Sequence, residues 1–213
     1  MSIATHKAHQ NAPSTSRHAA PSLVRTDIIA CLEKIGTRMA AQNKMAEIVL
    51  YGGSAIALLF DYRPSTHDVD FTLRVGDRYP LYDIAMDVGL EQGLPPNWFN
   101  DAVSIFTSDN PETRILGEFP KSNPGIRVFT ATPQYLLAMK LQSMRSSLES
   151  SDALDVWNLL DACGAKTPED ALALARKFYP DKLVERRAEL LLMDFFEAKQ
   201  ANAEYDPMLS WGL

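Results

Sequence analysis

The stretch Val49–Leu73, VLYGGSAIALLFDYRPSTHDVDFTL, contains a glycine turn and an aspartate pair close together in the chain. The short apolar run AEIVLY ends at Gly52 and Gly53, which predicts a strand that meets a tight turn. SAIALLFDY has the length and composition of a two-turn helix, which Pro64 closes. HDVDFTLRV alternates and is rich in Val, Phe and Thr, so it predicts the next strand.

The second strand presents two carboxylates. Because side chains alternate along a strand, Asp68 and Asp70 are expected on one face while Val69 points into the core. Two carboxylates on one face repel each other unless a cation lies between them. Hard oxygen ligands suit Mg²⁺ or Mn²⁺, which usually keeps waters and takes its remaining ligands from substrate phosphates.

The glycine turn suits the phosphates themselves. Gly52 and Gly53 allow the backbone to approach a ligand closely, and Ser54 is expected to begin a helix. The free N–H groups of that first turn favour an anion. A Gly-Gly-Ser alone is usually just a turn, and an Asp-x-Asp alone is usually solvated surface. In this order, with these strands, they predict a site for a metal-bound polyphosphate.

This ordered set resembles the DNA polymerase β-like nucleotidyltransferase superfamily, whose signature joins a Gly-Gly or Gly-Ser turn to Asp-x-Asp through roughly a dozen residues. Within it, YGGSAIALLFDYRPSTHDVDF is similar to the minimal bacterial nucleotidyltransferases and the AbiEii-like toxin group. Their Arg-x-x-Thr-x-Asp-x-Asp run is matched by Arg63, Thr66, Asp68 and Asp70. LPPNWFND is a weaker match to a connecting segment of that group.

A later helical segment extends the resemblance. TPQYLLAMKLQSMRSSLESSDALDVWNLL is similar to a segment of the group in which a Lys, an Arg and two Asp recur. Those positions are matched here by Lys140, Arg145, Asp152 and Asp155. Two departures stand out: the spacer from Ser54 to Asp68 is long, and the strand GIRVFTA has no third carboxylate. Two alternatives follow: Asp109, Glu118 or an aspartate of the helical half replaces that carboxylate, or the site holds its metal with two ligands only.

The resemblance implies a role for each matched residue. Asp68 and Asp70 would hold the metal, Gly53 and Ser54 the β- and γ-phosphates, and Lys140 would add positive charge, unless it is a solvated helix lysine. Arg63 would orient the aspartate strand or touch a phosphate. For the set Arg145, Asp152 and Asp155, an ion-pair network between helices is favoured over contact with the acceptor.

The remaining patterns predict an α+β fold with a small mixed sheet flanked by helices. Further helices are expected over residues 22–42 and 82–92, and strands over AVSIFT, TRILGEF and GIRVFTA. From Pro133 the chain predicts only helices, with a break near Ser150 and a capped start at Thr167. Four parts follow: a flexible tail (1–21), a nucleotidyltransferase-like core (22–132), a helical region (133–200) and a second tail (201–213).

Composition narrows the class of protein. The chain has 213 residues, a formal net charge of −6 and two cysteines, Cys31 and Cys163, far apart. No apolar run approaches the ~18 residues of a membrane span, and no signal-like segment begins the chain. Widely spaced thiols indicate a reduced, cytoplasmic protein. The net charge argues against a broadly basic surface that coats nucleic acid. Trp98 and Trp157 are expected to pack in the core.

The predicted activity is metal-dependent transfer of an NMP from an NTP to a hydroxyl. The acceptor stays open between an RNA end such as tRNA, a protein and a small molecule, and the toxin-like resemblance implies a toxin–antitoxin or phage-defence role with a cognate antitoxin. An Asp-x-Asp glycosyltransferase would explain the aspartates but not Gly-Gly-Ser. The other alternative is a catalytically silent scaffold that binds a partner.

Overall fold

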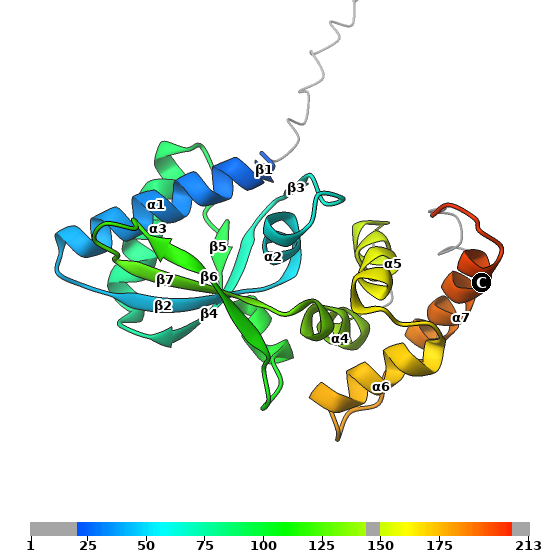
Figure 1. Ribbon diagram of the computed structural model, residues 1–213. Helices are drawn as coiled ribbons and strands as arrows, with labels where there is room; N and C mark the ends of the chain where they lie inside the picture. The colour runs from blue at the N-terminus through cyan, green and yellow to red at the C-terminus, as the bar shows by residue number, and fades with distance from the viewer. Residues whose placement is uncertain (1–20, 144–149, 206–213) are drawn as a thin grey trace, which may run out of the picture.

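The computed structural model describes residues 21–143 and 150–205 of the 213-residue chain (Figure 1). The predicted N-terminal tail therefore lies outside the described residues, apart from Pro21. Five strands form one mixed sheet in the order β5-β4-β2-β7-β6. They span Phe99–Asn100 (β5), Val69–Val75 (β4), Ala46–Leu50 (β2), Ile126–Ala131 (β7) and Thr113–Phe119 (β6).

The pairing around β2 places the turn next to the aspartates. β2 runs antiparallel to β4 and parallel to β7, with β5 parallel to β4 and β6 antiparallel to β7. The helix α2 (Gly52–Leu59) begins directly after β2, two residues before the predicted start. The backbone N–H of Tyr51 donates to the Asp70 carbonyl at 3.0 Å. The end of β2 and the start of β4 are thus tied together.

The two faces of the sheet differ in chemistry. On β4, Val69 and Phe71 are each 1% exposed and belong to the hydrophobic core. Asp70 and Thr72 alternate with them on the other face. The core face is covered by the helices α1 (Arg25–Ala41) and α3 (Arg78–Glu91), which lie along the sheet in Figure 1.

Both of these helices were predicted, but each begins at a different residue from the one predicted. α1 starts at Arg25 because Leu23–Val24 (β1) pairs antiparallel with Ser65–Thr66 (β3). α3 starts four residues before the predicted Tyr82. The Asp77 side chain accepts from the Tyr79 N–H at 3.1 Å and so caps this earlier start.

One predicted strand is wrong. AVSIFT forms a 3₁₀ helix, η1 (Ala102–Phe106), and not a strand. The Asn100 side chain accepts from the Ala102 N–H at 3.0 Å, which starts a turn and competes with extended backbone. Ile105 is 70% exposed, whereas Val103 and Phe106 are half-buried. The apolar side chains therefore follow a period of three, the period of a 3₁₀ helix.

After Ala131 the described chain is helical. The four helices are α4 (Pro133–Ser143), α5 (Ser150–Cys163), α6 (Pro168–Phe178) and α7 (Arg186–Gln200). They gather beside one end of the sheet in Figure 1. The predicted start of α6 is confirmed: the Thr167 hydroxyl accepts from the Asp170 N–H at 3.2 Å, and Asp170 accepts from the Thr167 N–H at 3.0 Å.

The tryptophans and cysteines largely follow the predictions. Trp98 is 1% exposed and Trp157 8%, and Tyr205 packs its ring against Trp157 at 5.7 Å between centroids. Cys31 is buried and Cys163 half-buried, and both are free thiols. Burial raises the pKa of Cys31 to about 11 and that of Cys163 to about 12, so both stay protonated. No helix of the described residues is long and apolar enough to cross a bilayer.

Candidate nucleotide and metal site

One cavity of about 370 Å³ collects most of the predicted site residues. It lies where the end of β2, the start of β4, η1, α4 and α5 meet. The polar part of its lining comes from both halves of the chain: Gly52, Gly53, Arg63, Thr66, His67, Asp68, Asp70, Lys140, Ser143, Ser151 and Asp152. Residues that are up to 100 positions apart in sequence thus face one space.

The aspartate pair lies at the edge of this cavity. Asp68 and Asp70 are both half-buried, and Val69 between them is in the core, as strand alternation predicts. Burial and the charge of Asp68 raise the pKa of Asp70 to about 6, although Lys140 and a hydrogen bond with the Asn100 side chain oppose the rise. Two carboxylates this close in the chain, at the edge of one cavity, are a place where a cation lowers the energy.

Gly52 is required by two separate features of the turn. Its φ of +56° lies in the left-handed region, which favours glycine. In addition, a Cβ atom at this position would lie 2.6 Å from Asp70 Oδ2. The absence of a side chain at Gly52 therefore lets the Asp70 carboxylate lie against the backbone that begins α2.

Gly53 is required by a different pair of neighbours. A Cβ atom there would lie 2.6 Å from Thr66 Oγ1 and 2.8 Å from Arg63 Nη2. Thr66 is 4% exposed, and its hydroxyl lies 3.5 Å from Asp68 Oδ1. The residues of the Arg-x-x-Thr-x-Asp-x-Asp run thus pack directly on the glycine turn.

Ser54 differs from its predicted role in one respect. Its side chain is 1% exposed and does not line the cavity, because its hydroxyl donates to the Tyr51 carbonyl at 3.0 Å. Only the backbone N–H of Ser54, in the first turn of α2, is left to meet a phosphate.

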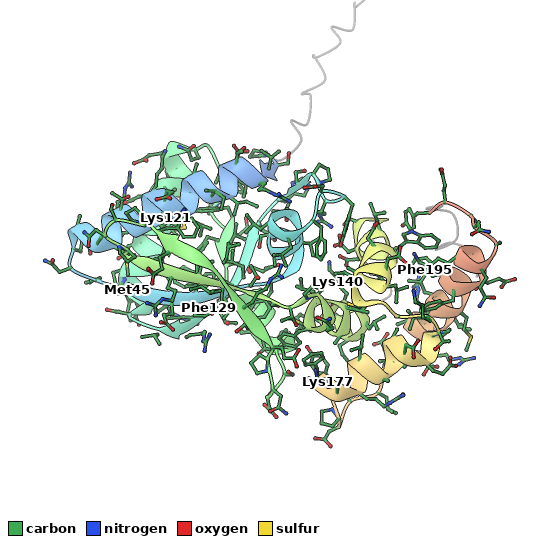
Figure 2. The ribbon with its side chains drawn as sticks, viewed as in Figure 1. Met45, Lys121, Phe129, Lys140, Lys177 and Phe195 are labelled. Atoms are coloured by element: carbon green, nitrogen blue, oxygen red, sulfur yellow. The ribbon has the colours of Figure 1, made fainter. Side chains whose placement is uncertain are left out.

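Lys140 reaches the cavity from α4, and Figure 2 labels it at the junction of the sheet with the helical half. Its side chain is 13% exposed. The ammonium group pairs with Asp152 and lies 3.0 Å from Asp155 Oδ2. Burial alone would lower the pKa of Lys140, but Asp155 and Asp152 together raise it, so the lysine stays charged.

Asp155 joins Lys140 to the other half of the chain. Its side chain is 0% exposed, and Oδ2 also accepts from Arg63 Nη1 at 2.6 Å, while Arg63 Nε donates to the Ser65 carbonyl at 3.0 Å. Asp155, Lys140, Arg63 and Asp152 therefore form an ion-pair network, called the site cluster below, which contains the predicted Asp152 and Asp155 but takes its cations from Arg63 and Lys140. Arg145, predicted to join it, lies outside the described residues.

The three sources predicted for a further carboxylate can be placed. Asp152 lines the cavity from α5 and is 41% exposed. Glu118 pairs with Arg127 at 2.7 Å away from the cavity, and Asp109 is exposed outside it. Of these three, the acid of the helical half is thus the one that faces the aspartate pair.

Sequence reasoning missed two parts of the site. Asn100 stands opposite Asp70 in the β4–β5 register, and its side chain lowers the pKa of that carboxyl. An apolar wall also lines the cavity, from η1 and α4: Ala102, Val103, Phe106, Leu136 and Met139. Reading AVSIFT with a period of three would have grouped Val103 with Phe106.

The residues present fit a divalent ion with few protein ligands. No group of three or more His, Cys, Asp or Glu side chains in the described part of the chain is arranged to hold a metal. Asp68 and Asp70 supply two carboxylates at one point of the cavity, and open space lies beside them. This donor set suits Mg²⁺ or Mn²⁺, which takes its other ligands from water and phosphate.

Comparison of the chain with protein-family models, with curated proteins and with solved structures returns no match.

Proposed function

We propose that the protein is a metal-dependent nucleotidyltransferase that moves an NMP from an NTP to a hydroxyl acceptor. The observation that supports this most is the shared cavity. The glycine turn, the aspartate pair and Lys140 come from three separate elements, yet they surround one space of about 370 Å³. That size suits a small-molecule ligand.

Each group has a part in binding the donor nucleotide. The N–H groups of Gly53 and Ser54 would bind the terminal phosphates at the start of α2. Asp68 and Asp70 would hold Mg²⁺ or Mn²⁺, which neutralises charge on the phosphates and on the pyrophosphate that leaves. The apolar wall, with Phe106 and Met139, would receive the base.

Lys140 would change partners when the nucleotide binds. Asp152, its exposed partner, can be replaced by a phosphate oxygen, while buried Asp155 keeps the lysine in place. Lys140→Met should therefore weaken triphosphate binding at least tenfold and leave nucleoside binding nearly unchanged, because a charge-assisted contact is lost. Calorimetry with ATP and adenosine would measure this, and comparable losses for both ligands would contradict the role.

The reaction forms a bond between the acceptor oxygen and the α-phosphorus and breaks the bond to the β-phosphate oxygen. The acceptor hydroxyl loses its proton and pyrophosphate leaves. A kinase would instead transfer the γ-phosphate, and a glycosyltransferase would release an NDP from a nucleotide-sugar. The fate of each phosphate therefore separates these activities.

Parallel reactions with α-labelled and γ-labelled NTPs test the proposal. Each contains Mg²⁺ and total RNA, a protein extract or a metabolite extract as acceptor. We expect the α-label on one acceptor and the γ-label in pyrophosphate. Asp70→Asn should abolish transfer, whereas Asp87→Asn, a matched change at an exposed position of α3, should not. Transfer of the γ-label would overturn the assignment.

Two observations favour a second candidate, a silent scaffold that binds a partner. The described residues hold no three-ligand metal group, and Lys140 is already paired. No label on any acceptor, together with NTP binding that is the same with and without Mg²⁺, would favour this scaffold. A toxin role with a cognate antitoxin belongs to the first proposal, an antitoxin role belongs to the scaffold, and a cytoplasmic location is proposed for both.

A further inference from the structure

A second cavity, of about 210 Å³, lies along the same strand as the aspartate pair. Thr72 and Arg74 line it, and they share the face of β4 that carries Asp70, because alternate side chains of a strand share a face. The other walls come from β2, from the segment after η1 and from β6: Val49, Tyr51, Thr107, Ser108, Pro111 and Thr113.

Hydroxyl groups make up much of this lining. Tyr51 Oη and Thr72 Oγ1 lie 3.3 Å apart and share a hydrogen bond. Ser108 Oγ is buried and has no hydrogen-bond partner among the described residues. A buried hydroxyl without a partner costs free energy, and a ligand that accepts its hydrogen removes that cost.

Arg74 gives the cavity a positive charge. Its guanidinium lies over the ring of Phe129, 4.5 Å from the centroid, and Figure 2 labels Phe129 on the sheet. None of the ion pairs in the described part of the chain involves Arg74. Arg127 on the neighbouring strand, in contrast, pairs with both Glu47 and Glu118. Arg74 is thus a cation whose charge a bound anion can neutralise.

The second cavity lies close to the aspartate pair along β4. A strand rises about 3.3 Å per residue, so Thr72 lies about 7 Å and Arg74 about 13 Å from Asp70 along β4. The chain from Val103 to Ser108 contributes residues to both cavities, so they are neighbours.

We propose that this second cavity binds a phosphoryl group of the acceptor, with Arg74 and the hydroxyls of Ser108 and Thr72 as its ligands. The assignment to the acceptor rests on the proposed nucleotidyl transfer, in which the first cavity is filled by the donor triphosphate. Binding a phosphate at ~7–13 Å from Asp70 would leave an adjacent sugar hydroxyl beside the aspartates.

Inorganic phosphate is the probe for the site itself. Amide signals of the full chain are followed by two-dimensional NMR during a phosphate titration. We expect saturable shifts at Thr72, Ser108 and Thr113, weakened at least tenfold by Arg74→Met. Arg114→Met removes an exposed arginine of β6 that lines neither cavity and should leave the shifts unchanged. Equal losses in both variants, or no shifts at these amides, would overturn the site.

The same titration separates this site from the donor site. Mg²⁺-ATP should shift Gly52 and Gly53, and Asp70→Asn should remove those shifts and leave the phosphate shifts at Ser108. If ATP fails to shift the glycines while phosphate still shifts Ser108, the proposed function fails and the anion site stands. If ATP shifts the glycines but phosphate does not shift Ser108, the donor site stands and the proposed anion site is wrong.

Two phosphate-bearing probes test which class of acceptor molecule supplies the phosphate. Glycerol 3-phosphate represents a small-molecule acceptor, and a short RNA with a free 3′ hydroxyl represents a nucleic-acid end. Binding of either one at Ser108, lost in Arg74→Met, supports the site and names the class of acceptor. Binding of neither would contradict it.

Discussion

The protein has two charge clusters of similar composition and opposite surroundings. The site cluster joins Arg63 and Lys140 to Asp155, whose side chain is 0% exposed. The sheet cluster joins Arg127 to Glu47 and Glu118, and these side chains are 20–37% exposed. Water screens the sheet cluster more strongly than the contacts of Asp155 with Arg63 and Lys140, so the same kind of contact has different consequences in the two places.

The site cluster also joins parts of the chain that the sheet cluster does not. Arg63 lies before β4, whereas Lys140 and Asp155 lie in the helical half, so removing the shared carboxylate affects the junction of the two halves. The sheet cluster connects three neighbouring strands that backbone hydrogen bonds already hold together. Single substitutions in each cluster can test which ion pairs the stability of the fold depends on.

The largest effect is expected for Asp155→Ala. This change leaves two poorly exposed cations without their shared partner, and breaking such a buried pair typically costs about 3–5 kcal/mol. Chemical denaturation would measure the loss, with Asp155→Asn as a variant of nearly the same shape. A loss no larger than that of Glu118→Gln would show that burial does not distinguish the two clusters.

A smaller loss of unfolding free energy is expected for Gly53→Ala, which crowds the site cluster without removing a charge. The new Cβ would lie 2.6 Å from Thr66 Oγ1, and such overpacking costs about 1–3 kcal/mol. Gly117→Ala on β6 is the matched control, since its Cβ would lie 3.6 Å from the nearest atoms, of Phe119. A loss for Gly53→Ala no larger than that for Gly117→Ala would contradict the steric explanation.

Asp70→Asn should stabilise the metal-free protein at neutral pH. The folded pKa of Asp70, about 6, lies above the ordinary aspartate pKa of 3.8, so the folded protein binds this proton more readily than the unfolded chain. Stability from this group is present below pH 4 and lost as the pH rises through 6. The variant lacks that loss and gains about 1–2 kcal/mol at pH 7–8.

Thermal unfolding from pH 4 to pH 8 in a chelating buffer would show the effect of Asp70. The difference between Asp70→Asn and the parent should shrink toward zero at pH 4. Asp87→Asn, at an exposed position of α3, should give no pH-dependent difference. A constant difference at every pH would mean that the gain does not come from titration of Asp70.

The smallest effect is expected for Glu118→Gln in the sheet cluster. Arg127 keeps its contact with Glu47 at 2.6 Å, and exposed pairs contribute little. The melting temperature should change by about one degree or less. A drop as large as that of Asp155→Ala would remove the distinction between the clusters.

The sequence predicts one part of the site well because that part is local. Gly52, Gly53, Asp68 and Asp70 follow each other through two strands and one helix, and strand alternation places both carboxylates at the cavity. The mixed α+β fold was predictable for the same reason, since each element has its own period.

Contacts between residues far apart in the chain could be predicted much less well from the sequence. The register that sets Asn100 beside Asp70 depends on the short strand β5, which no pattern in LPPNWFND indicates. η1 was predicted as a strand because AVSIFT is apolar and β-branched, yet the Asn100 side chain starts a turn there. The pairing of Arg63 with Asp155 joins residues 92 positions apart and depends on how α5 docks.

The chain from Phe106 to Ser108 is fastened by residues that the ribosome adds much later. The Ser108 N–H donates to Tyr135 Oη of α4 at 2.7 Å, and Tyr179 Oη, just after α6, donates to the Phe106 carbonyl at 2.6 Å. Both bonds fasten the chain that borders the two cavities, and their partners are made 27 and 73 residues later. A nascent chain can complete all five strands before Tyr179 leaves the exit tunnel. Until then the nascent chain holds the aspartates without the hydrogen bond from Tyr179 that fastens the wall of the cavity.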